Sequence, residues 1–88
     1  MPRVEKEIVI KSPQGLHARP AALFVQRASK YNAKVTIRKD GEEVDGKSIM
    51  GILTLGAQQN SKITLCVEGE DAEQAFDELE ALLTNETM

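Results

Sequence analysis

The chain has 88 residues, of which 41% are hydrophobic and 28% charged, with a formal net charge of −3 and only three aromatic residues. These values are typical of one globular domain with a modest core, and they argue against the basic, aromatic-rich surface of a nucleic-acid-binding domain. The single cysteine, Cys66, excludes an internal disulfide and a CxxC metal or redox site. No secretory leader and no apolar run of roughly 20 residues is visible, which predicts a cytoplasmic protein that does not insert into membranes.

Strand and helix patterns alternate from the N-terminus. A β-branched run within residues 4–10 predicts a strand, which the breaker sequence at 11–15 ends. Residues 18–30 then place apolar side chains at helical spacing. Pro20 fits the first turn of this helix, where its missing N–H has no helical partner to lose. The helix is therefore expected to begin close to His17.

The middle of the chain is typical of a hairpin followed by a short helix. Residues 34–38 and 42–44 alternate like strands, and Asp40-Gly41 between them is a two-residue hairpin signal. Ser48 is placed as the N-cap of a short helix. The apolar side of that helix is expected to hold Ile49, Ile52 and Leu53.

A strand and a helix close the chain. Residues 61–67 alternate clearly, and Glu68-Gly69 is expected to turn the strand. Asp71, with Gln74 three residues on, has the spacing of a capping box at the start of the last helix. The apolar stripe of that helix holds Phe76, Leu79, Leu82 and Leu83.

The resulting order is βαββαβα. Alternating strands imply an antiparallel sheet with one buried face, and three amphipathic helices must cover that face. The predicted fold class is α+β, a two-layer open-faced β-sandwich with a four-stranded antiparallel sheet and three helices on one face. Residues 1–88 are expected to form a single domain.

The only histidine, His17, stands at a predicted helix start, with Arg19 two positions later. Backbone N–H groups at a helix N-terminus lack intrahelical partners, and the helix dipole there favours anions. Arginine also offers a bidentate fork to phosphoryl oxygens. We therefore predict that His17 carries a phosphoryl group, bound with the help of Ala18 and Arg19. The alternative is a solvated or capping histidine without chemistry.

The rest of the sequence lacks catalytic machinery. It holds no second histidine, no Walker-type glycine loop and no metal-ligand cluster, so no metal and no cofactor are expected. One activated nucleophile without other machinery indicates a stoichiometric phosphoryl carrier with a phosphohistidine intermediate rather than a turnover enzyme.

Ser48 is a second candidate for modification. Its structural role is an N-cap, but a phosphate there would suit the helix dipole and add about two negative charges. Ile49 and Met50 follow directly, and exposed apolar side chains beside a reactive residue often mark a docking surface.

The segments GLHARPA at 15–21 and KSIMG at 47–51 closely resemble the HPr family, the histidine-containing phosphocarriers of the bacterial phosphoenolpyruvate-dependent phosphotransferase system. The resemblance covers essentially the whole chain. It implies phosphorylation of His17 at Nδ1, stabilisation of the phosphoryl group by Arg19, and regulatory phosphorylation of Ser48 by an ATP-dependent HPr kinase/phosphorylase. The family's docking surface corresponds here to Leu23, Gln26, Arg27, Lys47, Ile49, Met50 and Leu53.

The same resemblance implies the partners. Phosphorylated Enzyme I is the expected donor, IIA components of sugar transporters are the expected acceptors, and the chain is expected to act as a monomer. Two alternatives remain open. The first is a mainly regulatory or nitrogen-related adaptor, because Gln26 and Ser29 stand where enteric sugar-type members carry basic residues. The second is a small interaction or RNA-binding domain, which the net charge of −3 disfavours.

Overall fold

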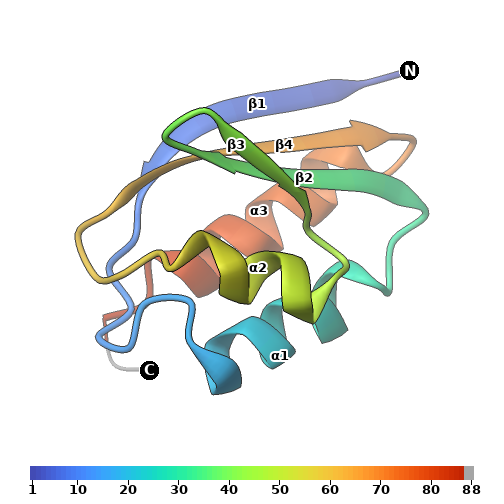
Figure 1. The fold of residues 1–88 in the computed structure, drawn as a ribbon. Coiled ribbons are helices and arrows are strands. Elements are labelled where there is room, and N and C mark those ends of the chain that lie inside the picture. The colour runs from blue at the N-terminus through green and yellow to red at the C-terminus, as the bar shows by residue number, and fades with distance from the viewer. Residues whose placement is uncertain (87–88) are drawn as a thin grey trace.

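A computed structural model describes residues 1–86 of the chain (Figure 1). The predicted order βαββαβα is confirmed, with shifts only at the ends of elements. The elements are β1 (Arg3–Val9), α1 (Ala18–Ala28), β2 (Ala33–Lys39), β3 (Glu42–Asp45), α2 (Ile49–Leu55), β4 (Lys62–Gly69) and α3 (Ala72–Leu83).

The four strands form one antiparallel sheet in the order β1-β4-β2-β3. β4 lies between β1 and β2, and its Ile63, Leu65 and Val67 are buried. The register sets Ile37 of β2 opposite Leu65 and Ile8 of β1 opposite Ile63. Because side chains alternate along a strand, these residues share the face that carries the core.

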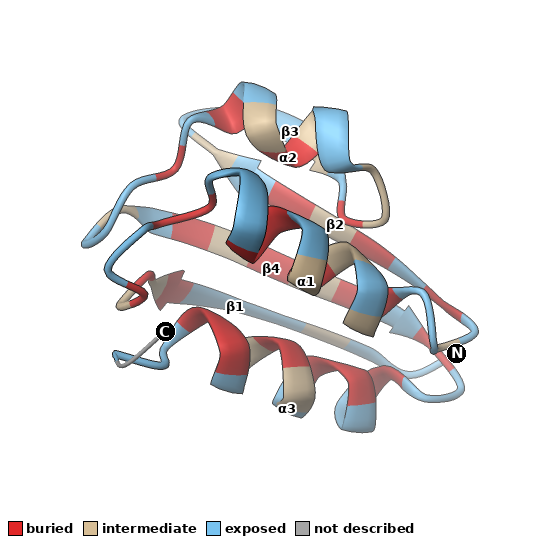
Figure 2. Ribbon diagram, turned by 90° about the horizontal axis from the view of Figure 1, so that it is seen from below, coloured by how far each residue is buried: buried red, intermediate tan, exposed pale blue. Residues whose placement is uncertain are grey.

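The helices lie on one face of this sheet, with α1 and α3 lying lengthwise along the strands and their buried residues turned toward them (Figure 2). α2 packs against α1 and against β3. Phe24 of α1 and Phe76 of α3 are almost completely buried between the layers. On the opposite face, Thr36, Thr64 and Cys66 are partly accessible. The predicted open-faced sandwich is confirmed.

The hairpin between β2 and β3 is also confirmed. Asp40 and Gly41 have φ values of +53° and +83°, as a type I′ turn requires at both central residues. The β2–β3 register closes directly across this turn, with Lys39 opposite Glu42.

Three local predictions were wrong. β4 does not turn at Glu68-Gly69 but continues through Gly69, because Gly69 still pairs with Ala33 of β2. Asp71 is the N-cap residue of α3, yet its side chain accepts no capping hydrogen bond, since its backbone lies outside the extended conformation typical of a capping residue. Ile49 is 42% exposed in the first turn of α2, outside the core cluster. The helix buries Ile52, as predicted, together with Leu55, and Leu53 packs half-buried against the core.

Ser12 gives a stability prediction for the loop that leads into α1. It is only 2% exposed, and its hydroxyl has no hydrogen-bond partner within residues 1–86. An unpartnered buried hydroxyl costs free energy, so Ser12→Ala is expected to raise the free energy of unfolding by about 1 kcal/mol. Urea unfolding measures the change.

A second serine provides the matched control for that prediction. The Ser61 hydroxyl accepts a hydrogen bond from the Gln58 N–H at 3.0 Å, so Ser61→Ala is expected to destabilise the protein. Equal losses of stability in Ser12→Ala and Ser61→Ala would contradict the assignment of an unsatisfied hydroxyl at Ser12.

Candidate functional site

His17 occupies the N-cap position of α1, as predicted. Its backbone is extended, with φ −82° and ψ −170°, and its carbonyl accepts a hydrogen bond from the Ala21 N–H at 2.8 Å. The imidazole makes no capping hydrogen bond, and the residue is exposed. The structure therefore rejects the reading of His17 as a side-chain cap and leaves the ring accessible to a reactant.

The first turn of α1 leaves two backbone donors beside this ring. Ala18 and Arg19 are the first two helical residues, and within residues 1–86 neither N–H has a backbone acceptor. Pro20, at the third helical position, has no N–H, and the Ala21 N–H already donates to His17. Two N–H groups and the positive end of the helix dipole thus converge on the place where an anion would sit.

A tight approach between two loops sets the position of His17. Gly15 has φ +60°, and a Cβ added to it would lie 2.5 Å from the Ala57 carbonyl oxygen. The neighbouring Leu16 N–H donates to that same oxygen at 2.8 Å, and the Leu16 side chain is buried. Only glycine combines this conformation with this proximity. Leu16 is therefore buried in the core, whereas the next residue, His17, lies at the surface.

The start of the same loop is held by α3. The backbone N–H groups of Lys11 and Ser12 both donate to the Leu83 carbonyl, at 2.9 and 3.3 Å. Ala57 and Leu83, whose carbonyls support this loop, were not predicted from the sequence. No sequence signal identifies them, because each contributes only a backbone carbonyl from a distant part of the chain.

Arg19 is exposed, two residues beyond His17. Considering residues 1–86, its guanidinium takes part in none of the ion pairs or side-chain hydrogen bonds. A planar fork of five donors is thus available for a phosphoryl group near His17.

Ser48 acts as the N-cap of α2, as predicted. Its hydroxyl accepts from the Gly51 N–H at 3.1 Å, and its backbone is extended. Directly after it stand Ile49 and Met50, which are 42% and 71% exposed. Since α1 and α2 are in contact, the motifs around His17 and Ser48 lie on neighbouring helices (Figures 1 and 2).

A family model described as the PTS HPr component phosphorylation site matches residues 4–85. The chain belongs to the HPr family. This confirms the resemblance drawn from the two motifs, and HPr is a family of phosphocarriers.

The similar proteins include some named phosphocarrier protein HPr and some named HPr-like protein Crh. An HPr-like protein Crh from Halalkalibacterium halodurans is 46% identical over 94% of this chain and 99% of its own length. The crystal structure of the phosphocarrier protein HPr from Bacillus anthracis is 46% identical, covers 94% of this chain and 99% of its own, and has a TM-score of 0.90. The crystal structure of Crh from Bacillus subtilis, described as a swapped dimer, is 40% identical, covers 94% and 95%, and has a TM-score of 0.77.

The residues that match the HPr docking surface differ in their burial and in whether their charged groups already have a partner. Leu23 and Leu53 are half-buried and pack against the core. Gln26, Ile49 and Met50 are exposed. The two cations are occupied, since Arg27 pairs with Glu78 at 3.5 Å and the Lys47 Nζ donates to the Tyr31 carbonyl at 2.8 Å.

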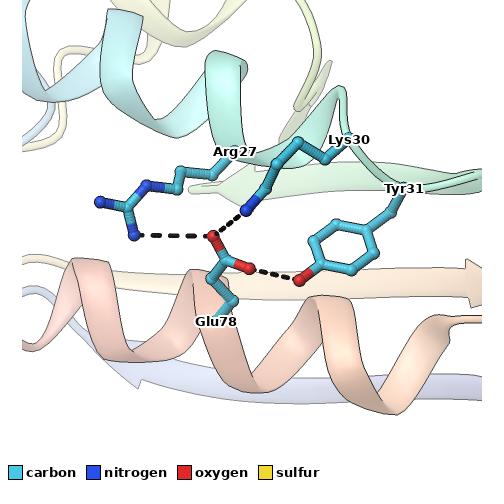
Figure 3. A network of polar contacts seen from close by, with 4 residues as sticks. All are labelled: Arg27, Lys30, Tyr31 and Glu78. Carbon is cyan, nitrogen blue, oxygen red and sulfur yellow. Dashed lines mark hydrogen bonds and ion pairs between the residues drawn. The ribbon is translucent and has the colours of Figure 1, made fainter.

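Glu78 of α3 is the centre of a polar network that was not predicted from the sequence. Its carboxylate accepts from the Tyr31 hydroxyl and the Lys30 Nζ, the latter at 2.9 Å, and pairs with Arg27 (Figure 3). These partners lie 47 to 51 positions away along the sequence, where local patterns carry no signal.

No helix within residues 1–86 has the length and apolar character to cross a membrane.

The network predicts how stability depends on pH. The Tyr31 hydrogen bond, followed by Lys30, lowers the pKa of Glu78 below its usual 4.5, and the Glu78 hydrogen bond raises the pKa of Tyr31 above 10.0. Because the pKa of Glu78 is lowered in the folded state, its ionised carboxylate stabilises the fold at pH values above the usual carboxyl pKa. This stabilisation is lost as the pH falls through the lowered pKa. Because the pKa of Tyr31 is raised in the folded state, its protonated hydroxyl stabilises the fold at pH values below the usual phenol pKa. This contribution is lost as the pH rises through the raised pKa.

We expect Glu78→Gln to flatten the acid limb of the stability profile, between about pH 5 and pH 3. Denaturant midpoints measured at a series of pH values test this. Glu73→Gln, an exposed carboxyl on the same helix, is the control and should retain the wild-type slope. Parallel profiles for wild type and Glu78→Gln would refute the role of the network.

Proposed function

We propose that this protein is a cytoplasmic phosphocarrier. His17 accepts a phosphoryl group from phosphorylated Enzyme I, derived from phosphoenolpyruvate, and passes it to IIA components of phosphotransferase-system transporters. The observation that carries the proposal is the accessible His17 ring at a helix N-terminus, with two unpartnered N–H groups and Arg19 beside it. Because all these groups come from one chain, the proposed acting form is a monomer.

The chemistry is a direct displacement at phosphorus. The lone pair of His17 Nδ1 forms the new N–P bond while the bond between phosphorus and the donor breaks, and its electron pair leaves with the donor. Charge then spreads over the phosphoryl oxygens, where the N–H groups of Ala18 and Arg19 and the Arg19 guanidinium stabilise it. Transfer to the acceptor repeats the step with His17 as the leaving group.

The surroundings of His17 suit a carrier better than a self-contained enzyme. A hollow of about 480 Å³ lies beside β2 and β3, lined by residues that include Lys34, Val44 and Lys47 but neither His17 nor Arg19. His17 itself stands exposed at a helix end. The partner must therefore supply the walls that exclude water during transfer.

Ser48 supports a second, regulatory function. We propose that an ATP-dependent kinase modifies its hydroxyl, so that the phosphate joins the N-terminus of α2 next to exposed Ile49 and Met50. The relatives named HPr-like protein Crh favour such a branch. In the alternative function, a regulatory or nitrogen-related adaptor, this modification matters more than transfer through His17.

The carrier function predicts an acid-labile label. Incubation with Enzyme I and labelled phosphoenolpyruvate should label wild type but not His17→Ala, because phosphohistidine has an acid-labile N–P bond. Arg19→Ala should slow transfer about 100-fold, the usual cost of losing one donor to a developing oxyanion. Arg38→Ala, an exposed arginine of β2, is the matched control. A label that resists acid, or that persists in His17→Ala, would contradict the proposal.

The regulatory role of Ser48 predicts a charge-specific effect. Ser48→Asp and Ser48→Asn both retain an N-cap of similar strength, but only aspartate adds a negative charge. At low salt, Ser48→Asp should raise the KM for Enzyme I several-fold over Ser48→Asn, because the added charge would repel the acidic partner surface that the resemblance to HPr implies, and the difference should shrink as salt rises. Identical KM values for the two variants would remove the electrostatic basis of the regulation.

A further inference from the structure

The cations of the first helix region fall into two groups. Within residues 1–86, Arg19 forms no ion pair, whereas Arg27 and Lys30 share the carboxylate of Glu78. We propose that Glu78 is a specificity-determining residue, which holds Arg27 and Lys30 against α3 and so limits how strongly this chain binds an acidic protein partner. The inference rests on the proposed carrier function, and it adds a residue outside both motifs.

The geometry makes Glu78 the fixed member of the network. Its side chain is only 21% exposed, and it is held by the Tyr31 hydroxyl and by Lys30 at 2.9 Å. The Arg27 side chain is 42% exposed and its contact with Glu78 is longer, at 3.5 Å. A carboxylate of a partner protein can therefore bind Arg27 most readily. To do so, it must break the ion pair between Arg27 and Glu78, which weakens the net binding.

Tyr31 extends the network toward the second motif. Its hydroxyl donates to Glu78, while its carbonyl accepts from the Lys47 Nζ at 2.8 Å. Lys47 directly precedes Ser48, so one short segment links α3 to the cap of α2. Replacing Glu78 by glutamine keeps an acceptor for the Tyr31 hydroxyl and removes only the negative charge.

An acidic protein is the partner class that these contacts favour. Arg19, Arg27, Lys30 and Lys47 lie on or beside α1 and just before α2, on a chain whose net charge is −3. Two of these cations already pair with a carboxylate, which shows that their positions suit carboxyl groups. A partner carboxylate would replace Glu78 as their counter-ion.

The experiment compares wild type, Glu78→Gln and Glu73→Gln in transfer from phosphorylated Enzyme I. Both variants remove one negative charge from α3, but only Glu78→Gln releases Arg27 and Lys30. At low salt, Glu78→Gln should lower KM about two- to fivefold at unchanged kcat, and the effect should disappear near 0.5 M salt, roughly. Glu73→Gln should have a much smaller effect. In an Arg27→Ala, Lys30→Ala background, Glu78→Gln should have no larger effect than Glu73→Gln.

A second readout keeps the inference independent of His17 chemistry. Poly-L-glutamate is titrated into each protein at low salt, and the Nε–H resonance of Arg27 is followed by NMR. Tighter binding and a larger Arg27 shift in Glu78→Gln than in Glu73→Gln support the inference. Equal responses of the two variants overturn it, since net charge alone would then explain them. Absence of label on wild-type His17 would overturn the carrier function instead, and the polyglutamate titration would still decide the role of Glu78.

Discussion

The contact between Gly15 and the Ala57 carbonyl is the constraint on which the site depends. Any side chain at position 15 would overlap that carbonyl, and the Leu16 N–H binds the same oxygen. With Leu16 buried, the next residue must turn outward, which is why His17 stands at the surface as the N-cap of α1. The His17 side chain is therefore placed by backbone packing of two loops rather than by contacts of its own.

The backbone N–H groups at the two ends of α1 differ in whether they have hydrogen-bond acceptors. At the N-terminus, the N–H groups of Ala18 and Arg19 have no backbone acceptors within residues 1–86. At the C-terminus, the N–H groups of Ser29, Lys30 and Tyr31 all donate to carbonyls of the last turn, and Glu78 binds the adjoining side chains. Free N–H groups are ordinary in the first turn of a helix, and here the exposure of Ala18 and Arg19 leaves theirs accessible to a ligand. This asymmetry is why the His17 end suits an anion.

Sequence patterns predicted the parts of this fold that local physics determines. Strict alternation located β4, Asp40-Gly41 located the hairpin, and Pro20 located the start of α1. The errors and omissions arose where distant segments decide. Gly69 continues β4 because Ala33 is there to pair with it. Glu78 is bound by residues that lie 47 and 48 positions away, more than half the length of the chain, so no local sequence pattern identifies them.

The electrostatics of His17 suit temporary storage of a phosphoryl group. A phosphoryl group on this ring adds about two negative charges to a chain whose net charge is −3. Among residues 1–86, the donors expected beside it are the N–H groups of Ala18 and Arg19 and the Arg19 guanidinium, and both residues are exposed, where water weakens each interaction. Tighter binding of the ground state would raise the barrier to handing the group on. The ion pairs of Arg27 and Lys30 with Glu78 are consistent with this proposed role, because these two cations are already neutralised and add little further attraction for a bound phosphoryl group.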